Sequence, residues 1–506
     1  MPEYLRSFVV ITGLMCIAYL ISRRLFAQAV EPKFVERLFG TGYCATAIMF
    51  LAGNMWLFLG GMALLSVLAA RRFTYPMALF VFLLLLMPGY SVQVPGFGLI
   101  NYLINLNPWR VLSFTLLLPA ALWLSSQKLL PKPGSLLADK LVLAFALYTS
   151  WLAYLHYDTF TGGLRQFAIM TLDSLLIYFV ASRGLILKGA VRHVMVALVM
   201  AGIFLALVGG FEFVKHWLLY SSVRKTLGAL PGLFGYLGRG DILRASATTG
   251  QPIVLGFVMM VAMLATVYVH KLVAPGPNRL LLWGLMGLGL LAAMSRGPWV
   301  GAVFGLAAIA LCSANPMGQL MKLLLGGLAA TVVLVLLPGG EKIIDYLPWV
   351  GTVDASNITY REMLWEQTQL VIGRHFWLGS IGYTELPEFD VVRQGGGFVD
   401  IVNSYVGVVL SSGVIGLGLY ASLIFMTIFQ NVRQAISGRE ELGEQAIYRP
   451  VLAGILVSAA ITIVTVSSIS QIAPLLIFLI GAGVANTCLV TNRVHVVKRP
   501  LARQYA

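Results

Sequence analysis

The amino-acid sequence predicts an all-α membrane protein: a polytopic bundle of about 12–14 transmembrane helices with a long periplasmic loop that contains amphipathic helices. Of its 506 residues, 59% are apolar and only 11% are charged, whereas about a quarter of a soluble globular protein is charged. Apolar runs of about 16–28 residues recur along the whole chain, and about 20 such residues cross the hydrocarbon of a bilayer. Basic residues lie singly or in pairs between these runs, where they orient helices.

The apolar runs predict fourteen spans. The run 41–70 is ambiguous, because it reads either as one long tilted helix or as two short helices broken at Gly53-Asn54, which would move the N-terminus to the other side. Arg23-Arg24 follows the first run in place of a small-residue cleavage site, so no cleavable signal is expected. The predicted spans are 7–22, 41–70, 76–91, 109–126, 141–156, 166–182, 192–211, 252–269, 279–294, 298–312, 320–338, 403–430, 449–468 and 471–490.

The distribution of Lys and Arg predicts the orientation. With the C-terminus in the cytoplasm, the inner loops collect more than half of the 35 basic residues, as the positive-inside rule requires. The loop 23–40, with four basic residues, is the exception and falls outside.

This organisation divides the chain into four parts: 1–251 with an outer loop at 212–251, central helices in 252–338, a periplasmic loop at 339–402, and helices with a cytoplasmic tail in 403–506. The periplasmic loop holds nine of the 20 acidic residues, and connections of this length are usually functional. Within it, 357–372 predicts an amphipathic helix with Asn357 as its N-cap. Its apolar side is expected to contain Leu364, Trp365, Thr368, Val371 and Ile372.

The net charge of +15 does not indicate a nucleic-acid partner, because no basic tract is present. All four cysteines lie in apolar runs. Neither a disulfide nor a metal site is therefore expected.

Three arginines are expected at the outer boundary of the membrane: Arg244 before a span, Arg296 in a tight connection between two spans, and Arg361 on the amphipathic helix. Guanidinium groups bind phosphate bidentately, so their convergence would make a diphosphate receptor. The alternatives are snorkelling to lipid headgroups or pairing with a nearby acid.

The predicted span at 403–430 begins in an unusually polar way. Asp400, Asn403 and Ser404 precede an apolar run that contains Gly413 and Gly416. These polar residues are expected either to cap the helix or to form the floor of a polar site above it, where free amides favour anions.

Taken in order, these segments resemble the O-antigen ligase and polymerase family of bacterial integral-membrane glycosyltransferases. The resemblance covers about residues 240–430. It includes Thr249-Gly250-Gln251-Pro252, Ser295-Arg296-Gly297 at the outer start of a span, an R-x-x-x-W helix at Arg361–Trp365, and Asn403 followed by nine residues and Gly413-Val414-Ile415-Gly416. One position departs from the ligases, which have a histidine where this chain has Val402. Valine cannot transfer a proton, and this departure favours a polymerase.

The resemblance implies a metal-independent enzyme of the bacterial inner membrane, without cofactors. Its donor would be a polyprenyl-diphosphate-linked oligosaccharide, its acceptor a glycan hydroxyl at the periplasmic face, and its partners the bilayer and other polysaccharide assembly proteins. Arg296, Arg361 and Arg244 would bind the diphosphate, with Arg361 also stabilising the developing charge. Asn403 would position the acceptor.

Asp400 is the expected base, because on a helix it would share a face with Asn403. Its rivals are Glu362, Glu385 and Asp390. The alternative for Asp400 is a charge stabilised by the helix dipole.

Two other functions remain open. One is a ligase that transfers finished polymer to lipid A core or protein. The other is a transporter or flippase, for which acids within the membrane would mark the route. Only Asp173 and Glu212 are expected within or near the hydrocarbon, and this sparseness disfavours ion coupling.

Overall fold

The computed structural model describes residues 1–98, 101–157, 159–230, 235, 238–239, 242–336, 355–393, 399–439 and 443–490. Helices dominate these ranges and the strands form two short antiparallel hairpins, so the predicted all-α class is confirmed. The helices of the first half are α1 (Glu3–Leu25), α2 (Pro32–Leu51), α3 (Met55–Ala70), α4 (Pro76–Leu86), α5 (Pro108–Leu112), η1 (Ser113–Leu117), α6 (Leu118–Ser126), α7 (Leu137–Tyr157), α8 (Phe160–Met170), η2 (Thr171–Leu175), α9 (Leu176–Gly184), α10 (Ala190–Lys215) and α11 (Ser221–Leu227).

The second half continues with η3 (Ala247–Thr249), α12 (Pro252–Val269), η4 (His270–Leu272), α13 (Pro277–Ala292), α14 (Arg296–Cys312), α15 (Pro316–Leu336), α17 (Ala355–Arg374), η5 (Tyr383–Glu385), η6 (Pro387–Val392), α18 (Ser404–Ser437), α19 (Glu444–Thr462) and α20 (Ile472–Val490). The strands are β1 (Val92–Pro95), β2 (Tyr102–Leu106), β3 (Gly238–Arg239) and β4 (Ile242–Leu243).

Eight helical segments of the described chain are long and apolar enough to cross a membrane, and shorter apolar helices lie among them. This composition and length fit a multi-pass membrane protein. Each predicted span except 41–70 overlaps one helical segment.

The run 41–70 is two helices, as its second interpretation predicts. Helix α2 ends at Leu51, and Asn54 caps α3 by accepting a hydrogen bond from the Leu57 amide at 2.9 Å. Gly53 between them has φ +69°, a conformation that glycine adopts without steric cost. A glycine followed by an N-cap residue therefore stops one helix and starts the next.

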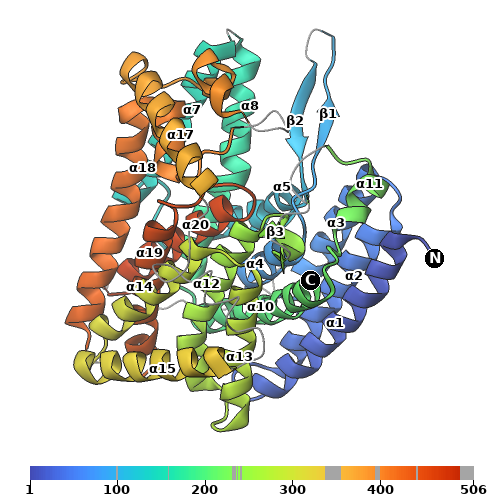
Figure 1. Cartoon of the computed structure of the whole chain (residues 1–506), viewed down its shortest axis with the longest axis vertical. Helices are drawn as coiled ribbons and strands as arrows, with labels where there is room; N and C mark the ends of the chain where they lie inside the picture. Colours follow the sequence, from blue (N-terminus) through green and yellow to red (C-terminus); the bar gives the residue numbers. More distant parts are fainter. Residues whose placement is uncertain are drawn as a thin grey trace.

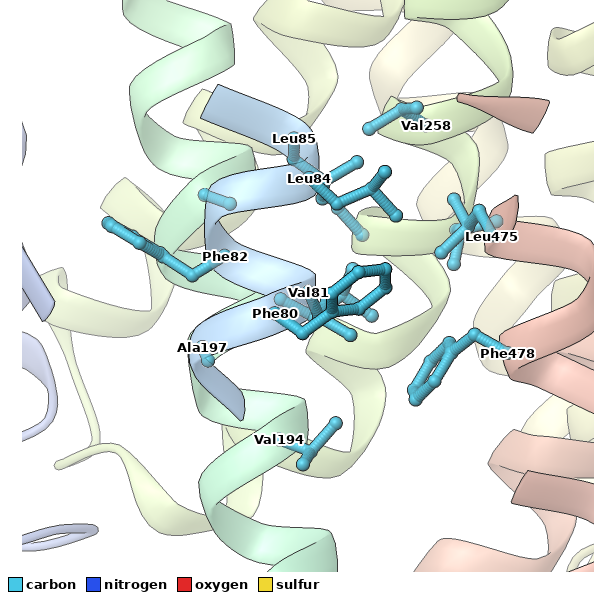
Figure 2. Packing of buried hydrophobic residues seen from close by; sticks show 14 of the residues in the cluster. Phe80, Val81, Phe82, Leu84, Leu85, Val194, Ala197, Val258, Leu475 and Phe478 are labelled. Carbon is cyan, nitrogen blue, oxygen red and sulfur yellow. The ribbon is translucent and has the colours of Figure 1, made fainter. Parts of the chain in front are cut away.

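Helix α4 forms the centre of the bundle (Figure 2). Ten of its eleven residues are buried, and a helix that is apolar on every side is expected in the interior. Phe80, Val81 and Leu84 face side chains of α10, α12 and α20, including Val194, Val258, Leu475 and Phe478.

Helix α17 confirms the helix predicted at 357–372, with two corrections. It begins at Ala355, so Asn357 lies inside it and is not the N-cap. Leu364, Thr368 and Val371 are buried as predicted, but Trp365 is 52% exposed. The buried side packs against Phe389, Val392, Ile401 and Leu410, which join α17 to η6 and to the start of α18.

The bundle has two distinct ends (Figure 1). Helix α17 and the β1–β2 hairpin lie at one end, and α13 and α15 lie at the other. The hairpin was not predicted; Arg165 holds it by donating to the carbonyls of Tyr102 at 2.7 Å and Leu103 at 3.0 Å. Exposed aromatic side chains gather near the α17 end, among them Trp151, Tyr154 and Trp377. Such residues are typical of a membrane–water interface.

Candidate functional site

The connection between α19 and α20 joins the segments that carry the predicted site residues. The predicted spans 449–468 and 471–490 leave almost no loop here, but α19 ends at Thr462 and α20 begins at Ile472. Nine residues, 463–471, therefore form a loop, which we call the α19–α20 loop. Its sequence contains Ser467, Ser468, Ser470 and Gln471. That polar cluster between two apolar runs is the signal that could have revealed it.

The start of α18 is bound to this loop. The Ser404 amide donates to the Ile463 carbonyl at 2.8 Å, and the Ser404 hydroxyl donates to the Val466 carbonyl at 2.6 Å. The hydroxyls of Ser468 and Ser404 are 2.8 Å apart. The first turn of α18 is thus fixed by three contacts with the loop.

Asp400 lies shortly before this turn, in irregular chain and not on a helix. The prediction that Asp400 and Asn403 share one helix face is therefore wrong. Ser467 of the α19–α20 loop donates from its hydroxyl to Asp400 Oδ1 at 3.3 Å and to the Ile401 carbonyl at 2.6 Å. The Asp400 amide hydrogen-bonds to the Tyr360 hydroxyl of α17 at 3.3 Å. Ser467 and Tyr360 were not identified from the sequence.

The surroundings of Asp400 shift its acidity. Burial raises the pKa of Asp400 above its usual range, while the Ser467 hydrogen bond and the positive charge of Arg361 offset part of that effect. Desolvation disfavours the carboxylate, and a donor or a nearby cation favours it. A carboxyl with a raised pKa is a stronger proton acceptor once it is ionised.

Asn403 is a helix cap. Its Oδ1 accepts hydrogen bonds from the amides of Tyr405 at 2.9 Å and Val406 at 3.2 Å. These bonds satisfy two of the amides that a helix start leaves unpaired. The side-chain oxygen of Asn403 therefore has a structural role. Only its side-chain nitrogen, Nδ2, remains to donate a hydrogen bond to an acceptor sugar.

Electrostatic effects link Asp400 to two residues of other segments. The positive charge of Arg361, whose side chain is exposed on α17, lowers the pKa of Asp400. The charge of Asp400 adds to burial in raising the pKa of the Tyr383 hydroxyl on η5.

Arg244 and Arg296 form a second group. Arg244 Nη2 donates to the Ser295 hydroxyl at 2.9 Å, and Arg296 is the next residue and the first of α14. The Ala245 amide donates to the Ala292 carbonyl at 3.0 Å. Both bonds hold the chain before α12 against the turn between α13 and α14.

The α19–α20 loop connects the two groups. A Cβ at Gly297, which follows Arg296, would meet the Thr465 hydroxyl, so the start of α14 packs directly on this loop. Thr465 is two residues from Ser467, which binds Asp400, and two residues span at most about 7 Å. The Ser470 hydroxyl also donates to the carbonyl of Thr249 at 3.1 Å. Thr249 is the first residue of the Thr249-Gly250-Gln251-Pro252 motif.

The Gly413 motif produces a break in α18. Gly413 has φ +64° and ψ −173°, which interrupts the helix. Residues 376–380 fill the break: the Ser380 amide donates to the Leu410 carbonyl at 2.7 Å, and the Val414 amide donates to the Phe376 carbonyl at 2.9 Å. The motif therefore anchors the segment 376–380, which follows α17.

The rival acids differ from Asp400. Glu362, Glu385 and Asp390 are exposed, and Asp390 pairs with Arg393 at 2.9 Å. Asp173 is also paired, accepting from Arg110 at 2.7 Å. Glu212 is fully buried and accepts three backbone hydrogen bonds, from Leu219, Ser246 and Ala247. Among these acids, Asp400 alone is half-buried beside both an arginine and a hydroxyl donor.

In the described part of the chain, no group of three or more His, Cys, Asp or Glu side chains is arranged to hold a metal ion. No protein-family model matches the sequence, and no curated protein matches it significantly.

Proposed function

We propose that this protein is a polysaccharide polymerase of the bacterial inner membrane, a member of the O-antigen ligase and polymerase family. It transfers a polyprenyl-diphosphate-linked glycan to the hydroxyl of an acceptor glycan at the periplasmic face. The observation that carries the proposal is the α19–α20 loop. It packs against Gly297, next to Arg296, and it hydrogen-bonds to Asp400, whose pKa the charge of Arg361 lowers.

The orientation supports a periplasmic site. If the C-terminus is cytoplasmic and α2 and α3 are two separate spans, then Arg23, Arg24, Lys33 and Arg37 would all fall on the cytoplasmic side. This removes the exception to the positive-inside rule. Arg37 Nη1 donates to the Arg72 carbonyl at 2.9 Å, which joins two loops that this orientation assigns to the same side.

The reaction follows from the chemistry of these groups. Arg296, Arg361 and Arg244 bind the diphosphate of the donor. The acceptor hydroxyl attacks the anomeric carbon and forms the new C–O bond while the C–O bond to the diphosphate breaks. The hydroxyl proton passes to the Asp400 carboxylate, and the electron pair leaves with the polyprenyl diphosphate. The guanidinium charges stabilise that leaving anion.

The same observations weigh against a transporter. Asp173 is held by Arg110, and Glu212 is held by three backbone amides. Neither acid is arranged to bind and release a coupling ion.

The experiment is complementation of a strain that lacks the gene, with polymer length as the readout. Arg296→Ala and Arg361→Ala are expected to abolish long polymer at normal protein levels. Arg374→Ala is the matched control, since Arg374 is on the same helix as Arg361 but pairs with Glu388. Normal polymer from both variants would overturn the diphosphate site. Loss of polymer attachment with normal chain length would instead support a ligase.

A further inference from the structure

A cavity lies at the end of the bundle opposite the candidate site. It has a volume of about 650 Å³. Helix α20 starts at the α19–α20 loop and ends at Val490, which lines the cavity. Its 19 residues span about 28 Å, close to the hydrocarbon thickness of a bilayer. The cavity and the candidate active site therefore lie at opposite ends of the same helices.

The lining of this cavity is basic. Arg433 of α18 and Arg449 of α19 contribute two guanidinium groups, and Gln430, Gln434, Ser437 and Thr487 add neutral polar groups. Among the described residues that line it, none is acidic. Asp139, the acid next to the lining residue Ala138, is bound by Arg183 at 2.6 Å. Its charge therefore does not offset the positive charge of Arg433, which is exposed at the cavity.

The walls are rigid. Asn486 Nδ2 donates to Asn431 Oδ1 at 2.9 Å and to Gln434 Oε1 at 3.1 Å, which joins α20 to α18. Arg183 is fully buried and joins α9 to the first turn of α7 through Asp139. Gln434 of the lining is thus held in place before a ligand arrives, which lowers the entropy cost of binding to it.

The lining also has an apolar part, formed by Leu136, Leu137, Met426 and Val484. Next to the cavity, Phe425 and Phe429 of α18 are 57% and 67% exposed, and Leu137 of α7 is 62% exposed. Large apolar side chains exposed on a membrane helix contact lipid, so the cavity borders the lipid phase. A ligand with both a phosphate and acyl chains matches this lining.

We infer that this cavity binds the phosphate headgroup of an anionic phospholipid. Arginines bind phosphate oxygens in a bidentate manner, and basic pockets between transmembrane helices on the cytoplasmic side bind anionic headgroups. The chain's own segment 491–506 is not complementary, because it carries Arg493, Lys498, Arg499 and Arg503 and no acid. This site is independent of the proposed glycan transfer.

The test is lipid retention by the purified full-length protein, measured by native mass spectrometry after mixing with phosphatidylglycerol or phosphatidylcholine. Wild-type protein is expected to retain phosphatidylglycerol preferentially, and Arg433→Gln to reduce that retention at least fivefold. Lys322→Gln is the control, since it removes an exposed positive charge from α15, outside the cavity. It is expected to leave retention unchanged.

Equal retention of the two lipids by wild-type protein, or unchanged retention by Arg433→Gln, would overturn the inference. A third arm adds inorganic phosphate without lipid. Arg433-dependent binding of phosphate together with no lipid retention would assign the cavity to a soluble phosphate and also overturn it. The readout needs no catalysis, so its failure is distinct from failure of the proposed function.

Discussion

The carboxylate of Glu212 accepts a hydrogen bond from the Ala247 amide at 2.8 Å, although 34 residues separate them in the chain. The same oxygen accepts from Ser246 at 3.0 Å, and the other oxygen accepts from Leu219 at 3.0 Å. These bonds fix the chain immediately after Arg244. Glu212 is therefore a positioning residue for the arginine that meets Ser295.

Glu212→Gln is expected to weaken donor binding. The glutamine side chain has only one acceptor oxygen. At least one of the three backbone N–H groups that bind Glu212 is therefore left unpaired, at a cost of about 1–3 kcal/mol. The apparent KM for the lipid-linked donor should rise about tenfold, equivalent to ~1.4 kcal/mol, with a smaller change in kcat. The measurement is steady-state kinetics in proteoliposomes.

Glu3→Gln is the control for this variant, because Glu3 is an acid with one hydrogen bond, to Trp217 at 3.1 Å. It is expected to keep the wild-type KM. A Glu212→Gln protein with wild-type KM would show that Arg244 does not need this support. A Glu212→Gln protein in which kcat falls while KM stays unchanged would contradict a role of Glu212 in donor binding.

The pH dependence of transfer tests Asp400. Burial raises the pKa of Asp400, so the acidic limb of kcat/KM should lie above the ordinary aspartate value of about 3.9. Ser467→Ala removes a hydrogen bond that favours the carboxylate. This variant should therefore move the acidic limb of kcat/KM to higher pH.

Asp400→Asn should remove the limb together with most of the activity. Stability provides the second check. The folded protein holds this proton more tightly than the unfolded chain, so wild-type stability attributable to Asp400 falls as pH rises between the ordinary and the raised pKa. A limb that stays in place in Ser467→Ala would contradict the role of Asp400 as the base.

The sequence predicts the membrane class and the helices well, because apolar runs long enough to span a bilayer have few alternatives. It predicts connections less well. The predicted span 449–468 continues past Thr462 with apolar and β-branched residues. The helix nevertheless ends at Thr462, because Ser404, Asp400 and Thr249 form hydrogen bonds with the loop that follows. Those partners are distant in sequence. Trp365 illustrates the same limit, since helical spacing alone did not show which part of α17 meets η6.

Gly413→Ala is expected to disrupt the segment 376–380, which fills the break in α18. The backbone conformation at Gly413 (φ +64°, ψ −173°) is nearly exclusive to glycine and costs other residues roughly 1–3 kcal/mol. In addition, a Cβ there would collide with the Trp377 carbonyl. The hydrogen bonds that hold 376–380 in the break should be lost, and with them the support for α17.

The measurement is thermal unfolding of the purified protein together with polymer length in cells. Gly418→Ala is the matched control, because Gly418 lies in the continuous part of α18 and a Cβ there meets nothing within 4 Å. It should be neutral or slightly stabilising, since alanine favours helix over glycine. Equal melting temperatures for the two variants would show that the break is not required.

The break at Gly53-Asn54 predicts on which side of the membrane the N-terminus lies. Glu3 accepts a hydrogen bond from Trp217, which follows α10 on the end that carries the 212–251 loop, so the N-terminus and that loop belong to the same side. Alkaline phosphatase, which is active only outside the cytoplasm, should be active when fused after Asn54 and inactive when fused after Arg72. The reason is that α3, between these points, is expected to cross the membrane once. Activity after Arg72 would place Arg71 and Arg72 outside, against the positive-inside rule, and would invert the candidate site toward the cytoplasm.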